Sequence, residues 1–281
     1  MIPSRCLILF LAATLAPVCA APPAVPTPKP NVDLPVFADG PAKGRNASYQ
    51  SEKFDAWIDA KLRLYIQPKD NGKPVGGVLT GYGTCYFSLG SRNSWRNVAK
   101  LEKIPAPTQQ AAKVEIAGEY EEGVDFTHTF EFTPAGVTML IVIKDPQNPK
   151  MQKRASNLSA VVTIPAVPGA TITTPADQIA ELTAGCSLRV AKPDEKNLGS
   201  VPFTAPFAIP IRPADRMETI GPWGPRSISI LMPTTKDRTH PPLYATGVVA
   251  SYTQAPPFTG YYVARNVFTR EKDKKIVIQV N

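Results

Sequence analysis

The chain has 281 residues, of which 31 are proline, and its formal net charge is +8 at pH 7. This length suffices for one large domain or two modest ones with a sizeable hydrophobic core, so neither a metal ion nor disulfides are needed for stability. A proline share of about twice the usual value is hard to reconcile with long helices but fits short strands, sheet edges and loops. The composition therefore favours an all-β fold.

The N-terminal residues have the layout of a cleavable secretory signal. Arg5 precedes an apolar run that is too short to span a bilayer comfortably, and Val18 and Ala20 occupy the positions that a signal peptidase reads. We expect residues 1–20 to be a signal peptide cleaved after Ala20, and the protein to be periplasmic or extracellular. Lipid attachment at Cys19 is disfavoured because Val18 precedes it. No later stretch is long and apolar enough to predict a transmembrane segment in the mature chain.

The composition changes along the chain and suggests its organisation. Residues 21–30 contain five prolines and no periodic apolar pattern, so residues 21–50 are predicted to be a proline-rich extended arm or linker. Residues 51–281 are predicted to be the β-sandwich domain. A division into two modules would fall near residues 165–185, where prolines and threonines gather. One short helix is predicted at 174–185, with a threonine as N-cap and a glycine at its end.

The main strand signal is alternation of apolar and polar residues with a period of two. Residues 61–67 alternate in this way and are predicted to form a half-buried strand. The pair Asn71 and Gly72 suits a tight hairpin turn because both residues can adopt positive φ. We therefore expect the next strand to run back over residues 78–89.

Residues 112–143 are predicted to form an antiparallel meander. The run 137–143 is apolar on both faces, as in a central strand of a packed sheet. The middle strand places four rings on one face: Phe126, His128, Phe130 and Phe132. Further strands are predicted at 158–164, 187–190, 227–232, 244–252, 261–268 and 276–280. This spacing predicts an all-β, mostly antiparallel β-sandwich, either of ordinary size or a large extended one, with one short helix.

Motifs for metal, cofactor or nucleophilic chemistry are missing from the sequence. The two histidines, His128 and His240, have no close cysteine pair beside them, and no serine-elbow, phosphate-binding or dinucleotide-binding motif occurs. We therefore predict neither a metal site nor a cofactor. His128 lies among phenylalanines and is predicted to be a structural imidazole, whereas His240 lies in a loop and is the better functional candidate.

Glycoside chemistry needs only two carboxylates that meet in space, and their separation cannot be derived from sequence. The candidates are Glu119, Glu121, Glu122, Asp125 and Glu131. The alternative is structural, because these residues fall at a hairpin tip and on the solvent face of a strand.

Aromatic rings beside arginines suggest a binding surface. Trp223 lies in a stiff Gly-Pro-Trp-Gly-Pro loop, and Trp95 lies between Arg92 and Arg96. Such rings can stack on sugars while arginines pair with carboxylate or sulfate groups. The alternative is that a loop tryptophan fills the open end of the sandwich. Trp57 is predicted to be a core residue. The predicted ligand-binding residues are Trp223, Trp95, Arg92, Arg96 and His240.

Two cysteines, Cys85 and Cys186, remain after removal of the signal. In an oxidising compartment they are predicted to form a disulfide, with two separately buried thiols as the alternative.

Three functions are compatible with these patterns. The favoured one is an exported, non-catalytic binding module for carbohydrate or another cell-surface polymer, with an anionic partner preferred because the chain is basic. The second is a carbohydrate-active enzyme, such as a hydrolase, lyase or epimerase. The third is a cell-envelope assembly or adhesion component whose proline-rich arm docks on a partner. Nucleic acid is not expected as a partner of an exported protein.

Overall fold

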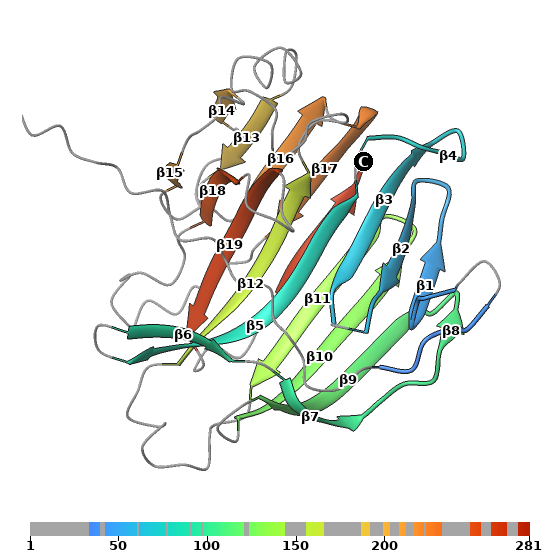
Figure 1. Cartoon of the computed structure of the whole chain (residues 1–281). Coiled ribbons are helices and arrows are strands. Elements are labelled where there is room, and N and C mark those ends of the chain that lie inside the picture. Colours follow the sequence, from blue (N-terminus) through green and yellow to red (C-terminus); the bar gives the residue numbers. More distant parts are fainter. Residues whose placement is uncertain are drawn as a thin grey trace, which may run out of the picture.

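The chain forms two β-sheets that pack face to face as a β-sandwich (Figure 1). In the computed structural model, every regular element within the described residues is a strand. The described residues are 34–39, 43–60, 62–76, 78–89, 92–96, 98–120, 124–143, 156–165, 187–191, 199–202, 208–211, 216–221, 223–231, 248–253, 260–268 and 275–281. The prediction of an all-β, mostly antiparallel sandwich is confirmed.

The first sheet has 11 strands, in the order β15-β18-β19-β12-β5-β3-β2-β1-β8, with β4 beside β3 and β6 beside β5. Its strands are β1 (Ala47–Gln50), β2 (Phe54–Ile58), β3 (Leu64–Asp70), β4 (Lys73–Pro74), β5 (Leu79–Leu89), β6 (Arg92–Arg96), β8 (Thr108–Gln109), β12 (Ser156–Pro165), β15 (Ala208–Ile211), β18 (Val248–Thr253) and β19 (Gly260–Phe268). Among the described strand pairs, only β1 and β8 run parallel.

The second sheet has 9 strands, in the order β14-β13-β16-β17-β20-β11-β10-β9-β7. Its strands are β7 (Val98–Lys103), β9 (Lys113–Tyr120), β10 (Val124–Thr133), β11 (Gly136–Ile143), β13 (Ser187–Ala191), β14 (Gly199–Pro202), β16 (Arg216–Gly221), β17 (Gly224–Leu231) and β20 (Lys275–Val280). Strands from both sides of residues 165–185 share each sheet, since β12 pairs with β19 and β11 pairs with β20.

The predicted meander is confirmed. Strands β9, β10 and β11 pair antiparallel in sequence order, and β11 lies inside the sheet between β10 and β20. The four rings that alternation assigned to one face of β10 are all buried: Phe126, His128, Phe130 and Phe132. On the opposite face, however, Val142 is 41% exposed. The apolar character of β11 on both faces therefore reflects its central position in the sheet rather than complete burial.

Period-two alternation explains how the first sheet contributes to the core. In β2 and β3 every second side chain is buried, so Phe54, Ile58 and Leu64 point toward the second sheet. These side chains join one continuous cluster with the buried faces of β9, β10, β17 and β20. The intervening side chains of β2 and β3 necessarily face outward, because successive residues of a strand alternate between faces.

The predicted Asn-Gly turn and the strand that runs back after it are both confirmed. Asn71 and Gly72 have φ of 48° and 75°, as a primed turn requires. The turn leads first into the two-residue strand β4, which the sequence did not predict. The predicted strand over residues 78–89 is β5, which pairs antiparallel with β3 at residues 79–81.

Part of the predicted arm belongs to the sandwich. Strand β1 lies within residues 21–50 and pairs with β2, and Leu34 is buried in the core. Leu34 and β1 therefore belong to the sandwich.

Several predictions fall on residues outside those described: the helix at 174–185, His240 and Cys186. Cys85 is placed only by the backbone of β5, so the Cys85–Cys186 disulfide stays a prediction. No helix within the described ranges has the length and hydrophobicity needed to cross a membrane.

The substitution Gly118→Ala is expected to reduce the free energy of unfolding by about 3 kcal/mol, the upper end for overpacking. A Cβ atom at this position would lie 2.2 Å from the carbonyl oxygen of Lys100 and 3.0 Å from the ring of Phe126. The clash involves the β7 backbone, so β7 would have to move. Urea unfolding measures the change. The control Ala117→Ser, on the outer face, should change stability by less than about 0.5 kcal/mol. A Gly118→Ala protein as stable as wild type would show that β7 does not approach this closely.

Candidate functional site

The outer face of the first sheet carries a stacked aromatic pair. Trp57 of β2 and Tyr65 of β3 are register partners, and their ring centroids lie 5.3 Å apart with an interplanar angle of 9°. Both side chains are half-buried. The prediction that Trp57 belongs to the core is therefore wrong. Phe54 and Ile58 are four residues apart and share the inner face, whereas Trp57 has the opposite parity and faces outward.

An arginine contacts each ring of this pair. The guanidinium carbon of Arg45 lies 4.6 Å from the Trp57 ring centroid, and that of Arg63 lies 5.6 Å from the Tyr65 ring centroid. Both distances lie within the range of cation–π attraction. We call Arg45, Trp57, Tyr65 and Arg63 the Arg–aromatic ladder.

Asp59 holds one end of the ladder in place. Its carboxylate accepts hydrogen bonds from the Arg63 backbone N–H (2.9 Å), Arg63 Nε (2.7 Å) and the Tyr65 hydroxyl (2.9 Å). Burial, assisted by the charge of Asp59 and the hydrogen bond to it, raises the pKa of Tyr65 well above its usual range. The phenol therefore stays protonated and acts as a donor, so it is a positioning group and not a general base.

The turn between β2 and β3 brings Asp59 and Arg63 together. Leu62 in this turn has φ of 61°, in the left-handed region that costs a leucine about 1–2 kcal/mol. Its side chain is nevertheless buried in the core, which offsets that strain. Backbone hydrogen bonds join Leu62 N to Asp59 O and Asp59 N to Arg63 O. The turn geometry thus places the acid and the arginine on the same outer face.

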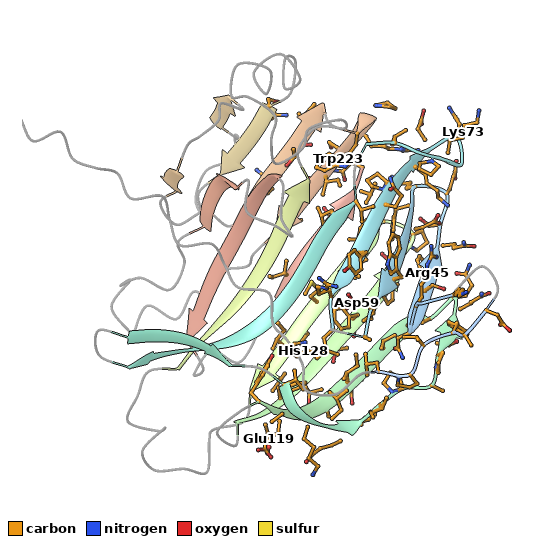
Figure 2. The ribbon with its side chains drawn as sticks, viewed as in Figure 1. Arg45, Asp59, Lys73, Glu119, His128 and Trp223 are labelled. Atoms are coloured by element: carbon orange, nitrogen blue, oxygen red, sulfur yellow. The ribbon has the colours of Figure 1, made fainter. Side chains whose placement is uncertain are left out.

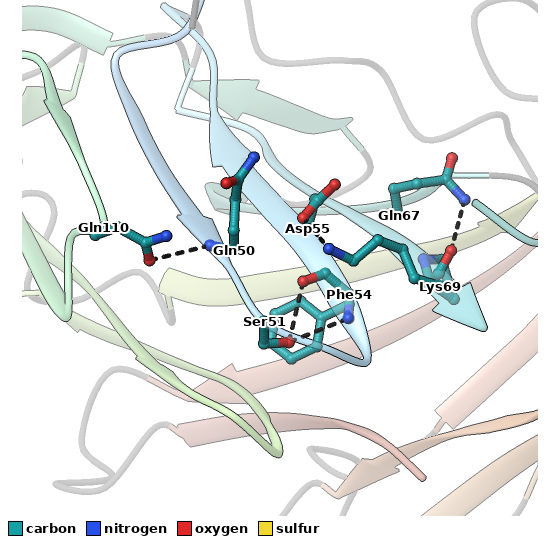
Figure 3. A network of polar contacts seen from close by, with 8 residues as sticks. Gln50, Ser51, Phe54, Asp55, Gln67, Lys69 and Gln110 are labelled. Carbon is teal, nitrogen blue, oxygen red and sulfur yellow. Dashed lines mark hydrogen bonds and ion pairs between the residues drawn. The ribbon is translucent and has the colours of Figure 1, made fainter. Parts of the chain in front are cut away.

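A row of polar side chains lies beside the ladder (Figure 3). Gln50, Asp55 and Gln67 are register partners across β1, β2 and β3. Lys69 Nζ lies 2.7 Å from Asp55 Oδ1, and the backbone N–H of Gln50 donates to Gln110 Oε1 at 3.3 Å. The outer face of β1–β3 therefore combines aromatic rings with amide, carboxylate and ammonium groups.

Trp223 does not lie at the surface. Its side chain is 0% exposed and belongs to the core cluster. The Arg226 backbone N–H donates to the Trp223 carbonyl, and Arg226 Nε donates to Lys69 O at 2.9 Å, which ties β17 to β3. The prediction of Trp223 as a ligand-contacting ring is corrected on this ground. Its position corresponds to the alternative, a tryptophan that fills the end of the sandwich (Figure 2).

The other predicted ligand-binding residues are placed only in part. Trp95 pairs with Tyr86, Arg92 with Leu89 and Arg96 with Cys85, all between β6 and β5 of the sheet that carries the ladder. The side chains of Trp95, Arg92 and Arg96 are outside those described, as is His240 entirely. Their role in binding stays a prediction.

The described candidate carboxylates lie on the outer face of the other sheet. Glu119 and Asp125 are register partners at the end of β9 and β10, and Glu131 is ion-paired with Lys113 at 3.5 Å. Glu121 and Glu122 are outside the described residues. Figure 2 shows Glu119 far from Asp59 and Arg45. Within the described part of the chain, no three metal-ligating side chains of His, Cys, Asp or Glu come together.

His128 is buried and hydrogen-bonded, as the sequence predicted. It is 1% exposed, and its Nε2 lies 2.8 Å from the Tyr120 hydroxyl. Burial lowers the pKa of His128 to about 3, so the ring is neutral at physiological pH. Among the described residues, its Nδ1 has no hydrogen-bond partner. This imidazole belongs to the core and cannot reach a ligand at the surface.

Comparison with known proteins finds a distant structural likeness but no match in sequence. No protein-family model and no curated protein matches the sequence. Among solved structures, the chain is similar to a galactose mutarotase-like protein from Lactobacillus casei ATCC 334, with 9% sequence identity and a TM-score of 0.44. The match covers 83% of this chain and 99% of the other. A likeness with so low a TM-score supports no conclusion about the function of this chain.

Proposed function

We propose that the protein is exported and binds carbohydrate or another cell-surface polymer without catalysing a reaction, through the outer face of β1, β2 and β3. The observation that carries this proposal is the stacked Trp57–Tyr65 pair with an arginine on each ring. Export is supported by the N-terminal signal pattern, with cleavage after Ala20.

The chemistry of this face suits a sugar polymer. Aromatic rings offer apolar surface to the C–H faces of sugars, while arginine and amide groups hydrogen-bond hydroxyl and acidic groups. Trp57 has Arg45 and Tyr65 as ring neighbours, so the surface presents ring edges and guanidinium groups rather than one bare ring. An extended polymer that lies across strands β1, β2 and β3 fits this arrangement better than a single enclosed sugar. The positive net charge favours an anionic polymer.

No described cluster favours the enzymatic alternative. The carboxylates Glu119, Asp125 and Glu131 lie on the other sheet, and the described histidine is in the core. The Asp59 carboxylate is engaged by Arg63 and Tyr65 at the surface. These contacts suit binding and positioning rather than proton transfer.

The substitution Trp57→Ala is expected to weaken polymer binding about tenfold, which corresponds to about 1.4 kcal/mol, because it removes one of the two rings of the ladder. Affinity electrophoresis of residues 21–281 through gels containing acidic or neutral polysaccharides measures the retention. The control Val142→Ala truncates an exposed apolar side chain on the second sheet and should leave retention unchanged. If Trp57→Ala folds normally and is retained like wild type on every polymer that wild type binds, this face is not the binding site.

A further inference from the structure

The positively charged side chains in and beside the ladder differ in whether a carboxylate lies next to them. Arg63 Nη2 lies 2.6 Å from Asp59 Oδ2, and Lys69 Nζ lies 2.7 Å from Asp55 Oδ1. For Arg45, by contrast, no carboxylate of the described residues lies within ion-pair distance. Of the two arginines of the ladder, Arg45 is therefore the one whose charge no carboxylate of the described residues compensates.

The backbone on both sides of Arg45 is held firmly. The Arg45 carbonyl accepts a hydrogen bond from Phe37 N (2.9 Å), and Gly44 N donates to Phe37 O (2.9 Å). The next residue, Asn46, is fully buried and donates its backbone N–H to Ile58 O (3.0 Å). Gly44 allows this approach because it has φ of 76°, which side chains rarely adopt. The Arg45 side chain therefore extends from a backbone segment that these hydrogen bonds hold in place.

The Trp57 ring lies against the Arg45 guanidinium, whose central carbon is 4.6 Å from the ring centroid, and so restricts how Arg45 can meet a ligand. A guanidinium over an indole uses one of its flat faces for the ring. Its N–H groups then point outward in the plane of the guanidinium, where a planar carboxylate can accept two parallel hydrogen bonds. A lysine at this position could supply the positive charge but not the coplanar pair of N–H donors of a guanidinium.

We infer that Arg45, stacked on Trp57, is the site at which the protein recognises carboxylate groups of an acidic polymer, such as the uronate units of a polysaccharide. This inference rests on the proposed function and names the ligand chemistry of the same face. Arg63 does not share this role, because its charge and its Nε are committed to Asp59. The specificity for acidic over neutral polymers therefore depends on Arg45.

The test compares variants of residues 21–281 on polymers that carry carboxylates, no charge or sulfate groups. The probes are polygalacturonate, its methyl ester and dextran sulfate, each in affinity electrophoresis, and the variants are Arg45→Gln and Arg45→Lys. The control Arg189→Gln removes one positive charge from the second sheet, where Arg189 pairs with Glu218 at 3.2 Å. Unfolding curves of all variants establish that each is folded.

The expected result is that Arg45→Gln weakens retention on polygalacturonate about tenfold or more, as for other charge-assisted contacts, and leaves the weaker retention on the methyl ester unchanged. Arg45→Lys should restore only part of the loss, and Arg189→Gln should cause none. If wild type prefers polygalacturonate and Arg45→Gln keeps the same preference, the inference is overturned. The proposed function is not affected by that result.

Two further outcomes also decide the matter. In the first, Arg45→Lys binds polygalacturonate as well as wild type, and Arg45→Gln loses binding to dextran sulfate and to polygalacturonate equally. This result would overturn the inference, because Arg45 would then act only as a positive charge and not through paired hydrogen bonds to a carboxylate. Wild type that binds none of these polymers, nor any neutral glycan, would overturn the proposed function and the inference with it.

Discussion

Trp223→Ala is expected to lower the free energy of unfolding by about 3–5 kcal/mol, the range for truncating a large buried aromatic side chain. Trp223 is 0% exposed and is among the largest fully buried side chains of the described core. Its removal would leave a cavity at the end of the sandwich where Arg226 joins β17 to β3. Because rigid strand backbones surround this end, the cavity should collapse only in part. Urea unfolding followed by far-ultraviolet circular dichroism measures the loss.

The same substitution at Trp57 provides a matched control. Trp57 is half-buried on the outer face, so Trp57→Ala should lose about 1 kcal/mol of stability while weakening polymer binding. Trp223→Ala, in the fraction that remains folded, should bind polymer like wild type. The reverse pattern, with Trp223→Ala stable and deficient in binding, would contradict the buried position of Trp223 and restore it as a ligand contact.

Stability is expected to fall as the pH decreases from about 6.5 toward 3, because of His128. Burial lowers the pKa of His128 to about 3, whereas an unfolded histidine titrates near 6.5. Between these values the unfolded state binds a proton that the folded state does not, so acid favours unfolding. One such proton gives a slope of at most about 1.4 kcal/mol per pH unit. Above about pH 6.5 both states are neutral and the effect disappears.

His128→Phe should remove this contribution to the pH dependence. A phenylalanine extends the ring cluster formed with Phe126 and Phe130 and has no titratable group. Surface carboxylates also respond to acid, for example Glu115, whose pKa is lowered by its hydrogen bond to Lys103. These groups are the same in both proteins, so the difference between the two pH–stability curves isolates His128. Identical curves from pH 6.5 to 4 would show that His128 is protonated in the folded protein.

The local patterns in the sequence predicted much of the sandwich. The meander of β9, β10 and β11 and the turn at Asn71 and Gly72 depend on period-two alternation and on the backbone freedom of individual residues. Both signals act over a few residues, so they can be recognised without knowledge of the partner strands. The sequence does not predict β1 and β8, at one end of the first sheet, because both strands are short and lie within or beside polar, proline-rich sequence.

The candidate site was less accessible from sequence. The sequence analysis places Trp57 in the core, although strict alternation along β2 separates it from the buried Phe54 and Ile58. Tyr65 carries the same outward parity in β3, which was the available signal for the aromatic pair. No such signal existed for Arg45, because it lies in the segment predicted to be an arm and meets Trp57 only after β1 pairs with β2.

The sequence by itself determined the fold class, the strand-rich composition and the inward-facing residues of the longer strands, because these follow from neighbouring residues. Only the tertiary structure decided that Trp57 is half-buried on the outer face while Trp223 lies in the core, and that Arg45 has no acidic partner among the described residues. The positions of Trp57 and Trp223 depend on which sheet lies against each face. Arg45 has no carboxylate partner among the described residues, because the β2–β3 turn holds Asp59 against Arg63 and the pairing of β2 with β3 brings Asp55 to Lys69. Register and sheet packing join residues distant in the chain, so local patterns do not encode them directly.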